Sequence, residues 1–136
     1  MKLKIGYKAL MDSAMEKIET LAQDQAQKLL QDSNVVFVDI RDIRELEREG
    51  MIPGALHAPR GMLEFWVDPE SPYYKPIFGE GKRLVLYCAS AWRSALATKT
   101  LQDMGLPHVC HLEGGFSAWK QANLPVAEKV AKSSKT

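Results

Sequence analysis

Two periodicities of apolar residues divide the chain into predicted strands and helices. Nearly continuous apolar runs at 35–40, 83–87 and 109–112 are typical of strands covered on both faces of a parallel sheet. Three- and four-residue spacing predicts helices over 7–18, 24–30, 43–48, 61–67 and 93–104, and one that begins at 114 and runs through 119. Strands that alternate with helices predict an α/β fold with a small, mainly parallel sheet and helices on both faces.

Glycine and proline mark the connections between these elements. Gly50 ends the helix over 43–48, and Pro53–Gly54 forms a turn before a short apolar piece at 55–56. The segment 68–82 holds three prolines and two glycines, which predicts a long surface excursion. The sequence shows neither an internal repeat nor a linker, so one domain is predicted.

Composition excludes several classes of protein. The 136 residues are 46% hydrophobic and carry 18 basic and 17 acidic side chains, which rules out disorder, collagen and disulfide scaffolds. No apolar run approaches the roughly 20 residues that span a bilayer, and Lys8, Asp12 and Glu16 interrupt any export signal. We therefore expect a cytoplasmic protein with no membrane partner. The basic residues gather at the two ends rather than in a dense stripe, so no nucleic-acid partner is expected.

The two cysteines, Cys88 and Cys110, are expected to be free thiols rather than a disulfide, because no export signal is found. Cys110 lies between His108 and His111 in the sequence, but strand geometry sends alternate side chains to opposite faces. A buried thiol is therefore predicted there, and no metal site.

Cys88 stands where an α/β sheet binds its ligands, directly after the strand 83–87 and just before a helix. Small residues follow it, which lets the backbone curl so that several N–H groups share one hollow. Such a cradle at a helix N-terminus stabilises an anion, and a thiolate equally. Arg93 adds a positive charge and a planar fork of donors for an oxyanion. The pattern predicts a nucleophilic cysteine in an anion-binding cup, for attack on sulfur, phosphorus or arsenic.

The segment 87–95, YCASAWRSA, resembles the active-site loop of single-domain rhodanese-like sulfurtransferases. Residues 38–41 with 50–55 resemble the first signature of that family, and 112–119 with 124–125 resemble its C-terminal signature. The resemblance covers about residues 18–126 and implies a three-layer rhodanese-like fold. It leaves 1–17 as an N-terminal helical extension and 127–136 as a basic C-terminal tail.

The resemblance implies transfer of a sulfane sulfur by double displacement. Cys88 would accept the outer sulfur of a small anionic donor such as thiosulfate, and the persulfide would pass it to cyanide, a thiol or a protein acceptor. No cofactor and no metal is implied. Cys88 and Arg93 are the candidate catalytic residues. The candidate substrate-binding residues are Ala89, Ser90, Ala91, Trp92, Ser94, Arg41 and Arg60.

Three acidic and basic positions near the strand ends have alternative interpretations. We expect Asp39 to give structural support, by holding loop backbone groups or an arginine. Arg41 and Arg60 would attract anionic donors if they face the pocket. The alternative is that they pair with neighbouring acids such as Glu45 or Glu64.

Two departures from the family pattern bear on function. Related loops often carry glycine where this chain has Ala91, which is strained if φ there is positive and harmless if φ is negative. Met51 stands where the family often has histidine, at a position we expect to be peripheral. A low-turnover persulfide carrier or a redox-sensing interaction module is the alternative function, which Ala91 and the basic termini favour, since basic termini could dock a partner protein. A phosphatase is disfavoured, because related phosphatase loops have five residues between Cys and Arg and usually His before the Cys. This loop has four, and Tyr87 precedes it.

Overall fold

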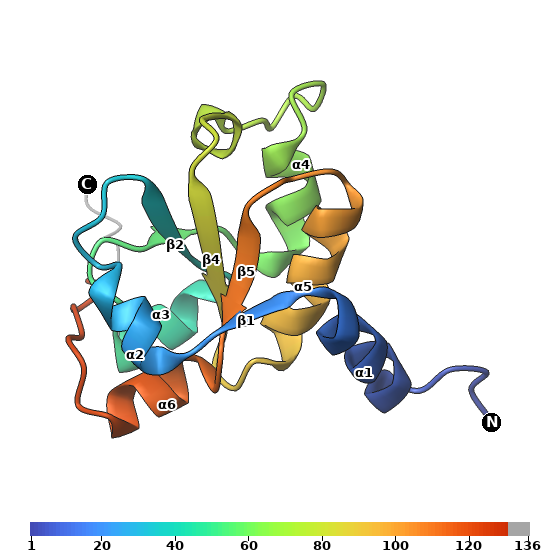
Figure 1. Ribbon diagram of the computed structural model, residues 1–136, viewed down its shortest axis with the longest axis horizontal. Helices are drawn as coiled ribbons and strands as arrows, with labels where there is room; N and C mark the ends of the chain where they lie inside the picture. The colour runs from blue at the N-terminus through green and yellow to red at the C-terminus, as the bar shows by residue number, and fades with distance from the viewer. Residues whose placement is uncertain (131–136) are drawn as a thin grey trace.

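The computed structural model describes residues 1–130, and five strands form one sheet at its centre (Figure 1). The spatial order is β1-β5-β4-β2-β3, and every neighbouring pair is parallel. The predicted α/β fold with a parallel sheet is confirmed. The strands are β1 (Glu19–Leu21), β2 (Val35–Asp39), β3 (Leu56–His57), β4 (Arg83–Tyr87) and β5 (Val109–Leu112).

Helices cover both faces of the sheet, and two buried clusters fill the spaces between the layers. One cluster joins β4 and β5 to α2 and α6 through Ala26, Phe116 and Trp119, and the other joins the opposite face to α4 and α5. In Figure 1, α1 lies on the outside of α5. The helices are α1 (Tyr7–Lys17), α2 (Gln23–Lys28), α3 (Ile43–Glu49), α4 (Leu63–Val67), α5 (Trp92–Asp103) and α6 (Gly115–Gln121), with short 3₁₀ turns at Arg60–Met62 and Pro76–Gly79.

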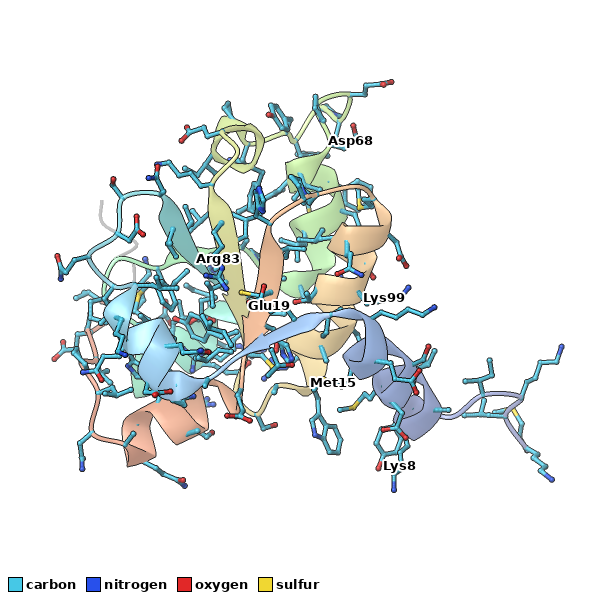
Figure 2. The ribbon with its side chains drawn as sticks, in the orientation of Figure 1. Lys8, Met15, Glu19, Asp68, Arg83 and Lys99 are labelled. Atoms are coloured by element: carbon cyan, nitrogen blue, oxygen red, sulfur yellow. The ribbon has the colours of Figure 1, made fainter. Side chains whose placement is uncertain are left out.

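The edge strand β1 was not predicted from the sequence, because three residues with one apolar side chain carry no strand pattern. Its backbone pairs with β5 from Glu19 opposite Cys110 to Leu21 opposite Leu112. The Arg83 guanidinium of β4 donates to the Glu19 carboxylate of β1 at 2.6 Å, across the intervening β5. Figure 2 labels both side chains. The ion pair thus helps to hold β1 at the edge of the sheet, beside β5 and away from β2.

Local capping explains where α3 begins and ends. The Asp42 side chain accepts the backbone N–H of Arg44, and the Glu45 side chain accepts the N–H of Asp42, which together form a capping box. Gly50 then leaves the helix with φ of +88°, a conformation that favours glycine. This helix carries Glu45 to the carboxyl edge of the sheet.

The surface excursion predicted at 68–82 contains a 3₁₀ turn, and its Phe78 is buried in the core beside α4. At the other end of the domain, Ala127 exchanges two backbone hydrogen bonds with Met51. The predicted basic tail at 127–136 lies mostly outside the described residues. Within residues 1–130, no helix has both the length and the apolar character needed to cross a bilayer.

Candidate active site

Cys88 follows the central strand β4, and its side chain is almost fully buried, with 1% exposed. Its Sγ accepts the backbone N–H of Ser94 at 3.3 Å. Ser94 lies in the first turn of α5, whose leading N–H groups have no acceptor within the helix. The sulfur therefore sits at the positive end of a twelve-residue helix, a position that favours a negative charge on it.

The loop after Cys88 is turned by its contacts with α6. The N–H of Phe116 donates to the Cys88 carbonyl at 2.8 Å, and the N–H of Ser117 donates to the Ala89 carbonyl at 3.0 Å. Because a trans peptide points its N–H opposite to its C=O, the N–H groups of Ala89 and Ser90 face away from α6. Among the described residues, the amides of 89–91 have no hydrogen-bond acceptor. They are free to bind an anionic group.

Gly115 permits this close contact between α6 and the loop. A Cβ at this position would lie 2.6 Å from the carbonyl oxygens of both Cys88 and Ala89, and φ is +64°. Only glycine satisfies both conditions. The Gly114–Gly115 pair thus shapes the loop as well as beginning the helix.

Ala91 has φ of +77° and is the residue that precedes α5. Of the two cases that the sequence left open, the structure shows the strained one, in which an alanine occupies the left-handed region. Such a conformation costs a non-glycine residue about 1–2 kcal/mol. Ala91 also has no side chain that could cap α5, so it offers no acceptor to the first amides of the helix.

Arg93 is half-buried and forms a two-pronged ion pair with Glu45 of α3, at 2.8 and 3.0 Å. The hydrogen bonds from Arg93 hold the pKa of Glu45 below its ordinary value. In turn, Glu45 and, more weakly, Cys88 raise the pKa of Arg93. The guanidinium therefore stays charged beside the sulfur, while two of its donors are already occupied.

The two other candidate arginines are not placed alike. Arg41 is fully buried: it donates to both carboxylate oxygens of Asp39, at 3.0 and 2.8 Å, and to the Gly50 carbonyl at 2.7 Å. Its guanidinium also lies 4.3 Å from the ring centre of Phe116. The structure thus places Arg41 in the interior, where Asp39 compensates its charge, and not at an open pocket where it could attract an anionic donor. Arg60 pairs with Glu64 at 2.9 Å, the alternative weighed from the sequence.

Trp92 is half-exposed and stacks on Tyr7 of α1, with ring centres 5.3 Å apart. The N-terminal helix thereby reaches the loop that carries Cys88. The sequence did not indicate this contact, because 85 positions separate the two rings along the chain. Aromatic stacking of this kind contributes about 0.5–1.5 kcal/mol.

Two further residues beside the site, His111 and Thr20, were not predicted from the sequence. The Ser94 hydroxyl, which faces inward, is 3.0 Å from Nδ1 of His111, and Nε2 of His111 is 3.0 Å from the Thr20 hydroxyl. His111 is fully buried, and burial lowers its pKa to about 4. The only local indication in the sequence is a histidine inside an otherwise apolar strand. Its two hydroxyl partners come from β1 and α5, which are distant in the sequence.

Cys110 is a free, buried thiol like Cys88, as expected, but it belongs to the core cluster on the other face of the sheet. Burial raises the pKa of Cys110 to about 11. The chain therefore separates its two thiols by the sheet itself, and only Cys88 lies at a helix N-terminus.

The fold and the loop define a class of α/β protein with a single cysteine held at the carboxyl edge of a parallel sheet. The rhodanese-like domain family model matches residues 22–122. The chain belongs to the rhodanese-like domain family, whose members include proteins named as sulfurtransferases and sulfur carriers.

Three relatives show how far the similarity extends. An uncharacterized protein of Synechocystis is 36% identical over 87% of this chain, which spans 61% of that protein's length. A structure from Rhodopseudomonas palustris, described as of unknown function and a possible tyrosine phosphatase, is 55% identical, with a TM-score of 0.90 over 93% of this chain and 97% of that one. The polysulfide-sulfur transferase homodimer of Wolinella succinogenes is 30% identical, with a TM-score of 0.68 over 90% of this chain and 88% of that one.

Proposed function

We propose that this protein is a sulfurtransferase of the thiosulfate type, which carries sulfane sulfur as a persulfide on Cys88. One observation supports this most: the Cys88 sulfur accepts the Ser94 amide at the N-terminus of α5, beside three loop amides that lack acceptors within residues 1–130. Arg93 adds a positive charge at the same place. Membership of the rhodanese-like domain family supports the same chemistry.

The proposed reaction has two displacements. The Cys88 thiolate attacks the outer sulfur of thiosulfate, the S–S bond of the donor breaks, and sulfite leaves with the bonding electrons. The terminal sulfur of the resulting persulfide carries the negative charge, which the loop amides can stabilise. Cyanide, a thiol or a protein acceptor then attacks that sulfur, and the Cys88 thiolate is released unchanged.

The test is thiocyanate formation from thiosulfate and cyanide. Cys88→Ser should abolish turnover, because a serine hydroxyl forms no persulfide. Cys110→Ala is the matched control and should retain turnover, since that thiol lies on the other face of the sheet. Equal turnover by wild type and Cys88→Ser would exclude the mechanism.

A low-turnover persulfide carrier is the second candidate function. The near-complete burial of Cys88 and the occupied fork of Arg93 favour it, because both hinder rapid exchange with small anions. Intact mass spectrometry separates the two functions. Addition of one sulfur that cyanide removes within seconds supports the enzyme, and an adduct that cyanide removes slowly supports the carrier. Hydrolysis of p-nitrophenyl phosphate without a sulfur adduct would instead support a phosphatase.

A further inference from the structure

A row of three hydrogen-bonded polar side chains, buried or half-buried, ends at Ser94, whose backbone contacts the Cys88 sulfur. It begins at the Thr20 hydroxyl of β1, passes through both ring nitrogens of His111 in β5, and reaches the Ser94 hydroxyl in α5. The backbone N–H of the same serine donates to Cys88 at 3.3 Å. Thr20 lies outside residues 22–122, which match the family model.

Burial decides how these groups bond. His111 and Ser94 are fully buried, and water is excluded from both. The pKa of His111 is about 4, so the ring is neutral near pH 7 and has one N–H and one lone pair. One hydroxyl must therefore donate to the ring and the other must accept from it. A buried polar group left unpaired here would be costly, so both hydrogen bonds to the ring are kept together.

We propose that Thr20 and His111 are positioning residues for Cys88: they hold Ser94 so that its backbone N–H points at the sulfur. Neither residue touches the reacting atoms, so each acts through Ser94. The inference rests on the proposed function, because it assigns the Ser94 amide a part in keeping Cys88 ready to attack a sulfur donor. Arg93, paired with Glu45, is the charged side chain beside the sulfur, and His111 is the titratable group behind Ser94.

Two substitutions of His111 separate positioning from simple packing. The amide of His111→Asn lies where Nδ1 lies and can still bond the Ser94 hydroxyl. The amide of His111→Gln lies nearer to Nε2, so it can reach Thr20 but not Ser94. Both variants replace an aromatic ring with an amide, so a packing defect would affect them in the same direction.

The measurement is the pH dependence of the alkylation rate of Cys88 by iodoacetamide, with the modified peptide identified by mass spectrometry. Cys110 adds little signal below pH 9, because burial raises its pKa to about 11. His111→Gln should move the midpoint of the Cys88 profile upward by about one pH unit, the equivalent of one lost hydrogen bond to a charged sulfur. His111→Asn keeps the bond to the Ser94 hydroxyl but loses Thr20, so it should move the midpoint by less than about half a pH unit.

Turnover provides the second readout. His111→Gln should lower kcat/KM for thiosulfate about tenfold and His111→Asn less than threefold, in line with the cost of one such hydrogen bond. If His111→Gln does not fold, Thr20→Val tests the same row of side chains from its outer end and should move the midpoint in the same direction. Equal midpoints for wild type and a folded His111→Gln or Thr20→Val would overturn the proposal, and so would equal shifts for the Asn and Gln variants.

The alkylation profile requires no sulfur donor, so the two proposals can fail separately. If wild type forms no thiocyanate but the midpoints differ as expected, the positioning role stands and the sulfurtransferase function falls. If thiocyanate is formed but the midpoints coincide, the positioning role falls alone.

Discussion

Ala91 is the residue at which the chain departs most from what its backbone prefers. A positive φ of 77° strains an alanine by about 1–2 kcal/mol and a glycine not at all, whereas glycine loses about 0.5–1 kcal/mol more through the unfolded state. The relief of strain therefore outweighs the entropy cost. Ala91→Gly should raise the free energy of unfolding by about 0.5–1 kcal/mol, measured by urea denaturation.

Ala89 supplies the matched control for this prediction, because it lies in the same loop but not at positive φ. Ala89→Gly gains no relief of strain, so it should lower the free energy of unfolding by about 0.5–1 kcal/mol. Opposite signs for the two variants would locate the strain at position 91. If Ala91→Gly destabilised the protein as Ala89→Gly does, the loop would not be strained there.

At the scale of elements, the contact between α6 and the loop determines the direction of the loop carbonyls. Gly115→Ala would place a Cβ 2.6 Å from two of these carbonyl oxygens, in a backbone conformation unfavourable to alanine. Steric overlap and backbone strain together should lower the free energy of unfolding by about 3 kcal/mol. The proposed sulfur transfer should fall with it even well below the melting temperature, because the loop must move away from α6.

Gly61 is the comparison site for this substitution, since a Cβ there meets nothing within 4 Å and φ is not positive. Gly61→Ala should change the free energy of unfolding by less than about 1 kcal/mol. A Gly115→Ala variant as stable and as active as Gly61→Ala would show that the loop does not depend on α6.

The elements with a strong apolar pattern could be predicted from the sequence. A strand whose position depends on hydrogen bonds to a distant strand could not. The strands at 83–87 and 109–112 were found with the bounds that the structure gives. Short β1 was missed, because its position depends on hydrogen bonds to β5 and on the ion pair between Glu19 and Arg83. Their partners are more than 60 residues away in the sequence, so no local signal indicates them.

The candidate site divides in the same way. The position of Cys88 after a buried strand and before a helix follows from local pattern, so it could be predicted. The burial of Arg41 could not, because it requires Asp39 and the Gly50 carbonyl to converge on one guanidinium. The occupied fork of Arg93 depends likewise on a carboxylate that α3 brings from 48 residues away.

The whole molecule should lose stability in acid because of a histidine. Burial lowers the pKa of His111 from its ordinary 6.5 to about 4, so between these values the unfolded chain binds a proton that the folded chain does not. Its stabilising contribution is complete above pH 6.5 and is lost as the pH falls toward 4. The free energy of unfolding should drop by about 3 kcal/mol over that range through this group.

The difference between wild type and His111→Asn, measured by urea denaturation from about pH 7 to about pH 4.5, isolates this contribution. Asparagine does not titrate, so the variant should show a shallower decline. Carboxylates such as Glu45, whose pKa is lowered by Arg93, affect both proteins alike and only at lower pH. Parallel declines would show that the imidazole is protonated equally in the folded and unfolded chains.

The stacking of Trp92 on Tyr7 has a practical consequence. Trp119 is enclosed in one core cluster and Trp66 packs against the other, on the opposite face of the sheet, whereas Trp92 is half-exposed and four residues after Cys88. A natural fluorophore thus lies close to Cys88. If Cys88 carries sulfur as proposed, loading should change the emission of this half-exposed indole with no dye attached, and its stacking on Tyr7 makes that emission sensitive to the position of the N-terminal helix as well.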